Sequence, residues 1–194
     1  MANTNAPFGM RPVRYLDGRP YTGHVMRAYI PASDSTAAYF IGDPVTIVGT
    51  STADGVPHVT RATVGTAVTT DRILGCFMGF ERDATYDSIS RADDTARYCL
   101  VTVGEDLLYE MQEDGNMGIT ATGGTCQIIA GSGNTYTGSS GFLIDSSEAA
   151  QTATDQLLII APVERPDNDP ASSYAKWLVK INMYCYAPGV AGVS

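Results

Sequence analysis

Turn-forming residues recur along the whole chain, and their spacing restricts it to short strands more than any other feature of the sequence. Proline, glycine, and Asp-Pro or Asp-Gly pairs such as Asp43-Pro44 and Asp54-Gly55 return at intervals of about 8–15 residues, which leaves little uninterrupted chain for helices. One helical turn is expected, over residues 172–177 after Asp169-Pro170. The spacing predicts an all-β protein, either a compact β-barrel or a β-sandwich of jelly-roll or tulip-like type.

The expected strands share an apolar alternation, or a short apolar run, between turn signals. They span residues 25–30, 45–48, 58–62, 73–80, 98–103, 107–112, 126–130, 142–144, 156–161 and 176–184. Two hairpins are expected, one through Asp54-Gly55 and one through Gly104-Glu105-Asp106. Gly75 and Gly79 share one face of their strand, which predicts close backbone approach or the sharp coiling that small barrels need. The glycine-rich stretch 115–141 is expected to form a hairpin with long loops.

The first 24 residues predict an extended N-terminal arm, attached to a single β-rich domain over residues 25–194. Three prolines interrupt this segment, so neither a helix nor a long strand fits it. Its side chains are more apolar than those of a solvated tail, and ordering the backbone costs about 1–2 kcal/mol per residue. Docking offsets that cost, and the surface is either the arm's own domain or a partner. The candidate interface residues are Phe8, Met10, Arg11, Arg14 and Tyr15.

Charge is distributed unevenly between this arm and the rest of the chain. Residues 1–33 hold four arginines against the single acid Asp17, while the whole chain has a net charge of -9. Two interpretations are equally open: a chance cluster in an exposed tail, or a basic arm that docks on an acidic neighbour, for example another copy of the chain. General binding to nucleic-acid phosphates is not expected from so acidic a chain.

Neither a targeting signal nor a membrane span is expected. The first ten residues lack the apolar stretch of a signal peptide, and the longest uncharged run, 115–144, is rich in glycine and small polar residues. Cys76, Cys99, Cys126 and Cys185 are far apart and form no C-x-x-C pair, so no zinc site is expected. Each lies in an apolar segment, which predicts buried, reduced thiols in a protein made in cytoplasm.

The residue patterns that usually carry catalysis or hold a cofactor are missing. The two histidines, His24 and His58, are far apart in the sequence, and no nucleophile motif accompanies them. The densest acidic group runs from Glu105 to Asp114, where solubilising charge at turns is favoured over a calcium site or a pair of hydrolytic carboxylates. No catalytic, metal or cofactor residue is therefore assigned, and an enzyme is not expected.

Several short motifs lie at turns and strand starts along the chain. They are Asn5-Ala6-Pro7-Phe8-Gly9-Met10-Arg11-Pro12-Val13, Gly42-Asp43-Pro44-Val45, Ile73-Leu74-Gly75-Cys76-Phe77-Met78-Gly79-Phe80, Thr95-Ala96-Arg97-Tyr98, Glu110-Met111-Gln112-Glu113-Asp114-Gly115, Glu164-Arg165-Pro166-Asp167-Asn168 and Ala175-Lys176-Trp177-Leu178-Val179. Together they resemble the capsid decoration proteins of tailed bacteriophages, also called cement proteins. The resemblance runs from the arm to the last strand, and its motifs are structural turns and strands.

This resemblance implies a non-enzymatic virion protein on the capsid exterior, assembled in the host cytoplasm. Such proteins bind the outer surface of an icosahedral head and bridge neighbouring major-capsid subunits against internal DNA pressure. The implied partners are the major capsid protein and further copies of the chain, with a homotrimer favoured and a homodimer as the alternative. No cofactor, nucleic acid or membrane is implied.

Two other functions stay open at this stage. A carbohydrate-binding β-domain on a phage or bacterial surface would stack surface tyrosines or Trp177 on sugar, although the apolar face of strand 176–184 favours a core position for Trp177. A small β-fold hydrolase would use the carboxylates between Glu105 and Asp114.

Overall fold

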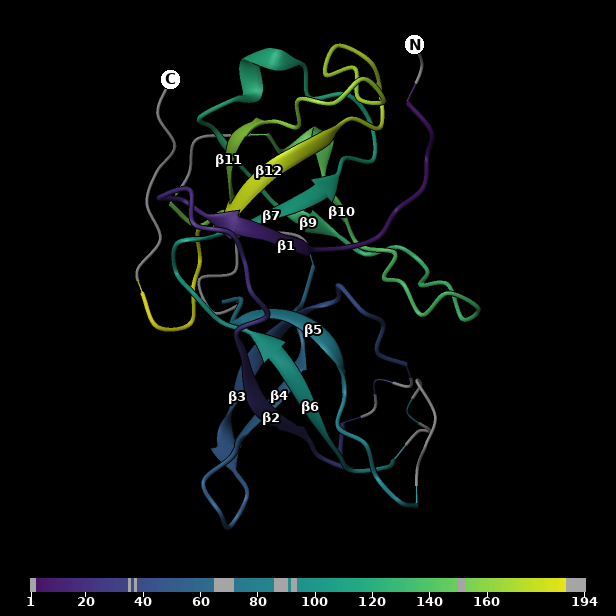
Figure 1. The fold of residues 1–194 in the computed structure, drawn as a ribbon, viewed down its shortest axis with the longest axis vertical. Coiled ribbons are helices and arrows are strands. Elements are labelled where there is room, and N and C mark those ends of the chain that lie inside the picture. The colour runs from purple at the N-terminus through teal and green to yellow at the C-terminus, as the bar shows by residue number, and fades with distance from the viewer. Residues whose placement is uncertain are drawn as a thin grey trace.

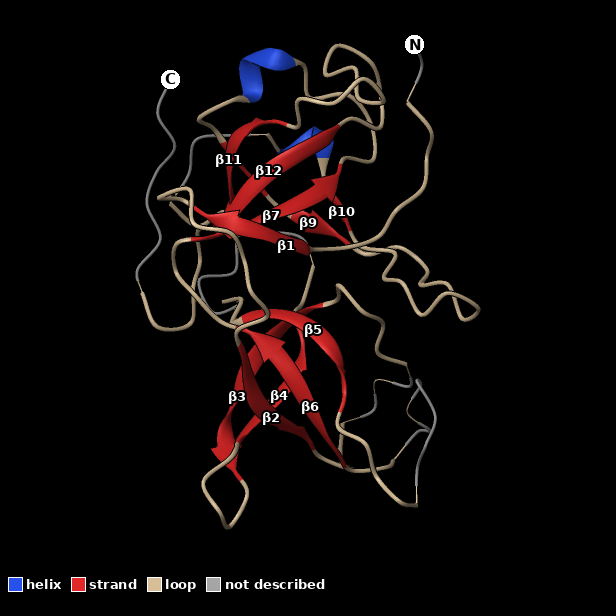
Figure 2. Ribbon diagram, viewed as in Figure 1, coloured by secondary structure: helices blue, strands red, loops and turns tan. Residues whose placement is uncertain are grey.

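The structure is a computed structural model, and it describes residues 3–34, 36, 38–64, 72–85, 91, 94–149 and 153–187. The first two residues of the predicted arm lie outside these ranges. The described residues form twelve strands and two short 3-10 helices, Ile119–Ala121 and Ser146–Glu148, which confirms the all-β prediction. Two β units lie one above the other along the long axis of the molecule (Figures 1 and 2).

The strands follow the expected segments closely in position. They are β1 (Arg11–Tyr15), β2 (Val25–Ile30), β3 (Pro44–Ser51), β4 (Pro57–Arg61), β5 (Gly75–Phe80), β6 (Arg97–Thr102), β7 (Leu107–Gln112), β8 (Thr125–Cys126), β9 (Ile128–Ile129), β10 (Leu143–Ile144), β11 (Leu157–Pro162) and β12 (Lys176–Ile181). The first strand, β1, lies within the predicted arm.

Five strands close into a small barrel in the order β2-β4-β3-β5-β6. The closure is completed by β2, which pairs parallel with β4 and antiparallel with β6. The predicted Asp54-Gly55 hairpin joins β3 to β4, and buried side chains such as Ile30 and Phe77 fill the interior. A Cβ on Gly75 would lie 1.8 Å from the carbonyl oxygen of Thr102 in β6. The predicted close backbone approach at this glycine is thus confirmed.

The second unit is a five-stranded sheet in the order β1-β7-β12-β11-β8, accompanied by the two-stranded β9–β10 pair. Neighbouring strands of the sheet are antiparallel. One face carries Tyr109 and Met111 from β7 and Trp177 and Val179 from β12, all with 0% exposure in one apolar cluster. The core position favoured for Trp177 is confirmed, and its ring has no surface left to offer a sugar.

The link 104–106 between β6 and β7 does not make the hairpin that its turn residues predict. In the barrel β6 pairs with β2 and β5, whereas β7 pairs with β1 and β12 in the sheet. The chain therefore crosses from one unit to the other at this link. The hydroxyl groups of Thr102 and Tyr109 share a buried hydrogen bond of 2.8 Å across the junction, and the backbone N–H of Cys76 donates to the Thr102 hydroxyl at 2.9 Å.

Three smaller features differ from the expected elements. Residues 126–130 do not form one strand: β8 pairs with β11, and β9 pairs with β10. Residues 172–177 form no helical turn, because turn residues lead directly into β12 at Lys176. The glycine-rich stretch contributes β8, β9 and the 3-10 turn, and its long-looped hairpin closes between β9 and β10.

Three of the four cysteines have the predicted buried, reduced thiols, whereas Cys185 is half-buried. All four are free thiols, and Cys76, Cys99 and Cys126 are buried. Burial raises the pKa of the Cys76 and Cys99 thiols to about 12, so neither is a nucleophile near neutral pH. Within the described ranges no helix is long and apolar enough to cross a membrane.

Candidate interaction surface

The N-terminal segment lies along the sheet and is bound to it from its first described residue. The side chain of Asn3 donates to the carbonyl oxygen of Asp169 at 2.8 Å. The side chain of Gln112 accepts from the N–H of Ala6 at 2.9 Å and donates to the carbonyl oxygen of Thr4 at 2.8 Å. The segment then becomes β1, an edge strand paired with β7. Of the two surfaces left open by the sequence, the chain's own sheet therefore holds this segment.

Two of the predicted interface residues are tied to the core. Met10 is 1% exposed and its N–H donates to the carbonyl oxygen of Gly42 at 2.8 Å. The backbones meet closely there, because a Cβ on Gly9 would lie 2.4 Å from the same oxygen. Tyr15 is half-buried and packs against the same apolar cluster. Met10 is thus a core residue and is not available to a partner.

The other predicted interface residues reach the surface. Phe8 is half-buried beneath Arg11, whose guanidinium carbon lies 4.3 Å from the centre of the Phe8 ring. Arg11 also lies 4.0 Å from the carboxylate of Glu110. The side chain of Arg14 is exposed and has no hydrogen bond, ion pair or ring contact within the described residues. These three side chains are the part of the predicted interface that is open to a partner.

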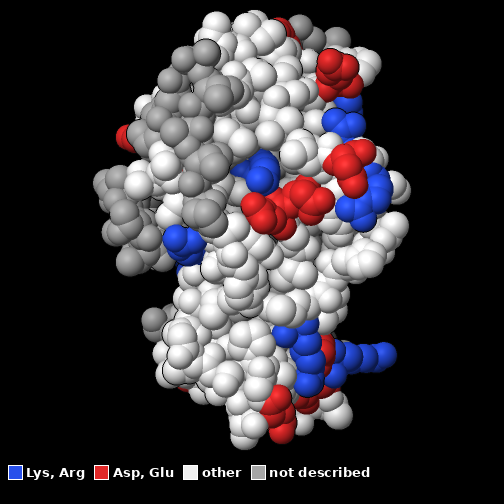
Figure 3. Space-filling view, turned by 90° about the vertical axis from the view of Figure 1, so that its left-hand side faces the viewer, with Lys and Arg blue, Asp and Glu red and all other residues white. Residues whose placement is uncertain are grey.

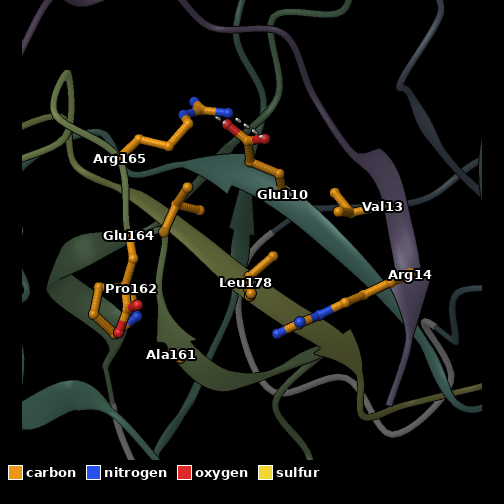
Figure 4. A pocket seen from close by; sticks show the side chains of 9 residues that line it. Val13, Arg14, Glu110, Ala161, Pro162, Glu164, Arg165 and Leu178 are labelled. Atoms are coloured by element: carbon orange, nitrogen blue, oxygen red, sulfur yellow. Dashed lines mark hydrogen bonds and ion pairs between the residues drawn. The ribbon is translucent and has the colours of Figure 1, made fainter. Parts of the chain in front are cut away.

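An open groove of about 440 Å³ lies on the outer face of the sheet, beside β1 and the segment that follows β11 (Figure 4). We call it the outer groove. Val13 and Leu178 supply apolar lining, and the side chain of Arg14 reaches from β1 across the groove toward Leu178. At another wall Arg165 binds Glu110 through two hydrogen bonds of 2.7 and 3.1 Å.

The Glu110–Arg165 pair belongs to a charged network that sequence analysis missed. The Glu110 side chain is only 5% exposed, and its two hydrogen bonds raise the pKa of Arg165. Arg165 also lies 3.2 Å from Asp167, which accepts from Lys176 at 2.8 Å. The Lys176 hydrogen bond lowers the pKa of Asp167 below its ordinary value. A glutamate at a buried strand position was the available signal, but its partner is distant in the sequence.

The acidic group between Glu105 and Asp114 divides into residues with separate structural partners. Glu113 is fully buried and accepts from the backbone N–H groups of Met117 at 2.8 Å and Ala175 at 3.2 Å. Asp114 accepts from the N–H of Ser146 at 2.9 Å. No group of three or more metal-ligating side chains occurs in the part of the chain that the structure describes. These contacts give Glu113 and Asp114 a role in stabilising the fold, and the buried Glu113 is not the solubilising charge that the sequence favoured.

A row of aromatic side chains crosses the outer face of the barrel, and it was not identified from the sequence. The ring of Tyr29 lies between those of His58 and Tyr98, at 5.0 Å from each ring centre. Arg27 extends the row, with its guanidinium 3.7 Å above the Tyr98 ring and two hydrogen bonds of 2.8 Å to Glu81. The row becomes visible only once β4, β2 and β6 are known to be neighbours.

Charged side chains on one face of the molecule stand in small groups of both signs, separated by uncharged surface (Figure 3). The described residues of that face form no extended basic stripe of the kind that tracks a nucleic-acid backbone. No protein-family model matches the chain, and comparisons with curated proteins and with solved structures give no match. The arginine-bearing edge strand, the outer groove and the aromatic row therefore remain as the guides to function.

Proposed function

We propose that the chain is a capsid decoration protein, which binds the outside of an icosahedral phage head and bridges neighbouring major-capsid subunits. The observation that carries the proposal is that the motifs resembling this family, although distant in sequence, contact one another. The carbonyl oxygen of Gly42 accepts from Met10, and the N–H of Gly42 donates to Phe77, both at 2.8 Å, which joins three motifs. Glu110 and Arg165 join two more. Arg11 lies 4.0 Å from Glu110 and links these two groups, so five of the seven motifs form a connected framework.

Exposed arginines on the N-terminal segment support docking against an acidic capsid surface. The side chains of Arg11 and Arg19 are 56% and 65% exposed, and Arg14 has no partner within the described residues. In a chain with a net charge of -9, this edge is where an acidic neighbour is repelled least. Many copies around one shell bind with avidity, so modest affinity per copy suffices. The copies assemble as a homotrimer, with a homodimer as the alternative.

Rebinding to capsids tests the proposal. Purified chain is added to expanded heads of its own phage from which the decoration protein has been stripped. Saturable binding to the outer surface is expected, together with a higher temperature of capsid disruption, because a ligand that binds the intact shell stabilises it. Heads that still carry their full complement serve as the control and should bind none. Absence of binding at micromolar concentration would overturn the proposal.

A charge variant tests the role of the edge strand. Replacing Arg11, which lies in β1, with serine should weaken capsid binding and make it less sensitive to salt, because screened charge pairs are removed. Arg27→Ser, on the barrel, removes one positive charge elsewhere and is the control. Salt dependence equal to that of the wild type would rule out electrostatic docking through this edge.

The aromatic row favours a second candidate, a carbohydrate-binding β-domain. Tyr29 and Tyr98 are half-buried on the outside of the barrel, and aromatic rings stack on sugars, although Arg27 already covers one face of the Tyr98 ring. Glycan-array binding that disappears in Tyr98→Ala would support this function. Trp177→Ala is not informative there, because Trp177 is fully buried.

A further inference from the structure

The loop between β9 and β10, residues 130–142, carries the most exposed large apolar or aromatic side chain among the described residues. Tyr136, in the middle of this loop, is 97% exposed. Figure 1 shows this loop, in green, standing out from the molecule beside β10. Residues 131–141 are glycine, serine, threonine and asparagine around this one tyrosine, with no charged side chain. Antibody binding loops use the same composition, in which tyrosine supplies contact area and small polar residues adapt to the partner.

Hydrogen bonds hold this loop, which we call the tip loop, in a defined shape. The side-chain oxygen of Asn134 accepts from the N–H groups of Tyr136 at 2.9 Å and Thr137 at 3.1 Å. Segment 138–140 is bound to Ile41 by two backbone hydrogen bonds, of 2.8 and 2.9 Å. A preformed loop loses little conformational entropy on binding, so its exposed tyrosine is suited to act as an anchor.

Arg14 in the outer groove offers a site that fits such an anchor. Three other exposed arginines, Arg11, Arg19 and Arg27, lie over aromatic rings of their own chain, at 4.3, 4.7 and 3.7 Å from the ring centres. Arg14 has no such ring within the described residues, and its side chain extends over the apolar lining of the groove (Figure 4). An aromatic side chain from outside would complete the arrangement that the other arginines already have.

We propose that the tip loop of one copy inserts Tyr136 into the outer groove of a second copy, against Arg14. The ring would pack on Val13 and Leu178, which supply apolar lining on either side of the Arg14 side chain. Tyr136 is 97% exposed, so it does not occupy the groove of its own chain. A second copy is the occupant that the structure favours, because one chain carries both halves of a complementary contact and, among the described residues, neither half has a partner. This contact would account for the assembly of copies that the proposed function includes. It rests on the proposed function for that assembly and not for capsid binding.

Sedimentation velocity of the purified full-length chain, over a range of micromolar concentrations, tests this contact. The wild type should associate, and Tyr136→Ala and Arg14→Ser should each weaken association about tenfold or more, as for an interface anchor. The double variant should be about as weak as either single variant, because both changes remove one contact. Tyr136→Phe should associate nearly as the wild type does. Tyr186→Ala, which removes another exposed tyrosine (65%), is the control and should change nothing.

Mixing the two single variants tests whether the halves meet between copies. Tyr136→Ala retains the groove and Arg14→Ser retains the tip, so the mixture should form mixed pairs held by one intact contact and associate more strongly than either variant does alone. A wild type that stays monomeric, variants that associate as the wild type does, or a mixture without recovery would each overturn the proposal. Unchanged melting temperatures of both variants show that folding is not the cause. No capsid is present, so these outcomes are separate from failure of capsid binding.

Discussion

At the scale of single residues, the tightest constraint lies at Gly75. A Cβ there would stand 1.8 Å from the carbonyl oxygen of Thr102, so β5 and β6 would have to separate. We expect Gly75→Ala to lower the free energy of unfolding by about 1–3 kcal/mol or more, the usual cost of overpacking, as measured by urea denaturation. Gly49→Ala is the matched control, because Gly49 lies in β3 with nothing within 4 Å of its Cβ position. Equal stability of the two variants would contradict the close approach.

A single buried carboxyl group, that of Asp43, makes the stability of the fold depend on pH. Its side chain is 1% exposed, and burial raises its pKa although the N–H of Phe40 donates to it at 3.0 Å. The folded state therefore binds a proton more tightly than the unfolded state does. This contribution to stability is complete below the ordinary pKa of 3.8 and is lost as the pH rises through the higher folded-state value.

We therefore expect the Asp43 contribution to stability to decrease as the pH rises above 3.8 toward neutral. Asp43→Asn is uncharged at every pH and should reduce this slope in urea unfolding measured across that range. Part of the slope should remain, because burial also raises the pKa of Glu113. A slope identical to that of the wild type would show that Asp43 does not titrate in this way.

At the scale of elements, the N-terminal segment acts as a strand of the sheet. It supplies β1 and the core side chain of Met10, and its removal would leave β7 as an unpaired edge. Deleting residues 1–21 should therefore lower the urea midpoint strongly, since loss of a buried methionine side chain alone costs about 2–5 kcal/mol. Leu16→Ser, at a side chain 54% exposed, is the control and should be nearly neutral. A truncated chain as stable as the full one would show that the segment is only an arm.

Strand positions were predictable because they depend on local sequence, whereas strand partners were not. The bounds of β2 and β7 agree with the expected segments, since alternation and flanking turn residues define both. Gly104-Glu105-Asp106 has the chemistry of a hairpin yet joins two different units, because β6 and β7 find their partners far along the chain. The Glu110–Arg165 pair in the groove was not predicted for the same reason, because its two residues lie far apart in the sequence. From the sequence, Met10 could contact either a partner or the chain's own core. The pairing of β1 with β7 places it in the core.

At the scale of the whole molecule, the barrel and the sheet share buried contacts. Ile73 and Cys76 lie where the barrel meets the sheet. They belong to the same apolar cluster as Tyr109 and Trp177 of the sheet. The buried hydrogen bond between Thr102 and Tyr109 joins the last strand of the barrel to the sheet. Two units that share a core in this way are expected to lose their structure together.

Unfolding followed by two signals tests this coupling. The single tryptophan, Trp177, reports on the sheet, while far-UV circular dichroism reports on both units, and their transitions should coincide. Tyr109→Phe removes the tyrosine hydroxyl and with it the hydrogen bond to Thr102. It should lower the free energy of unfolding by the same amount in both signals, about 0.5–1.5 kcal/mol. A shift confined to the tryptophan signal would instead mean that the barrel folds independently. Coupled unfolding would also mean that the shared core holds the arginine-bearing edge of the sheet and the aromatic row of the barrel in fixed relative positions.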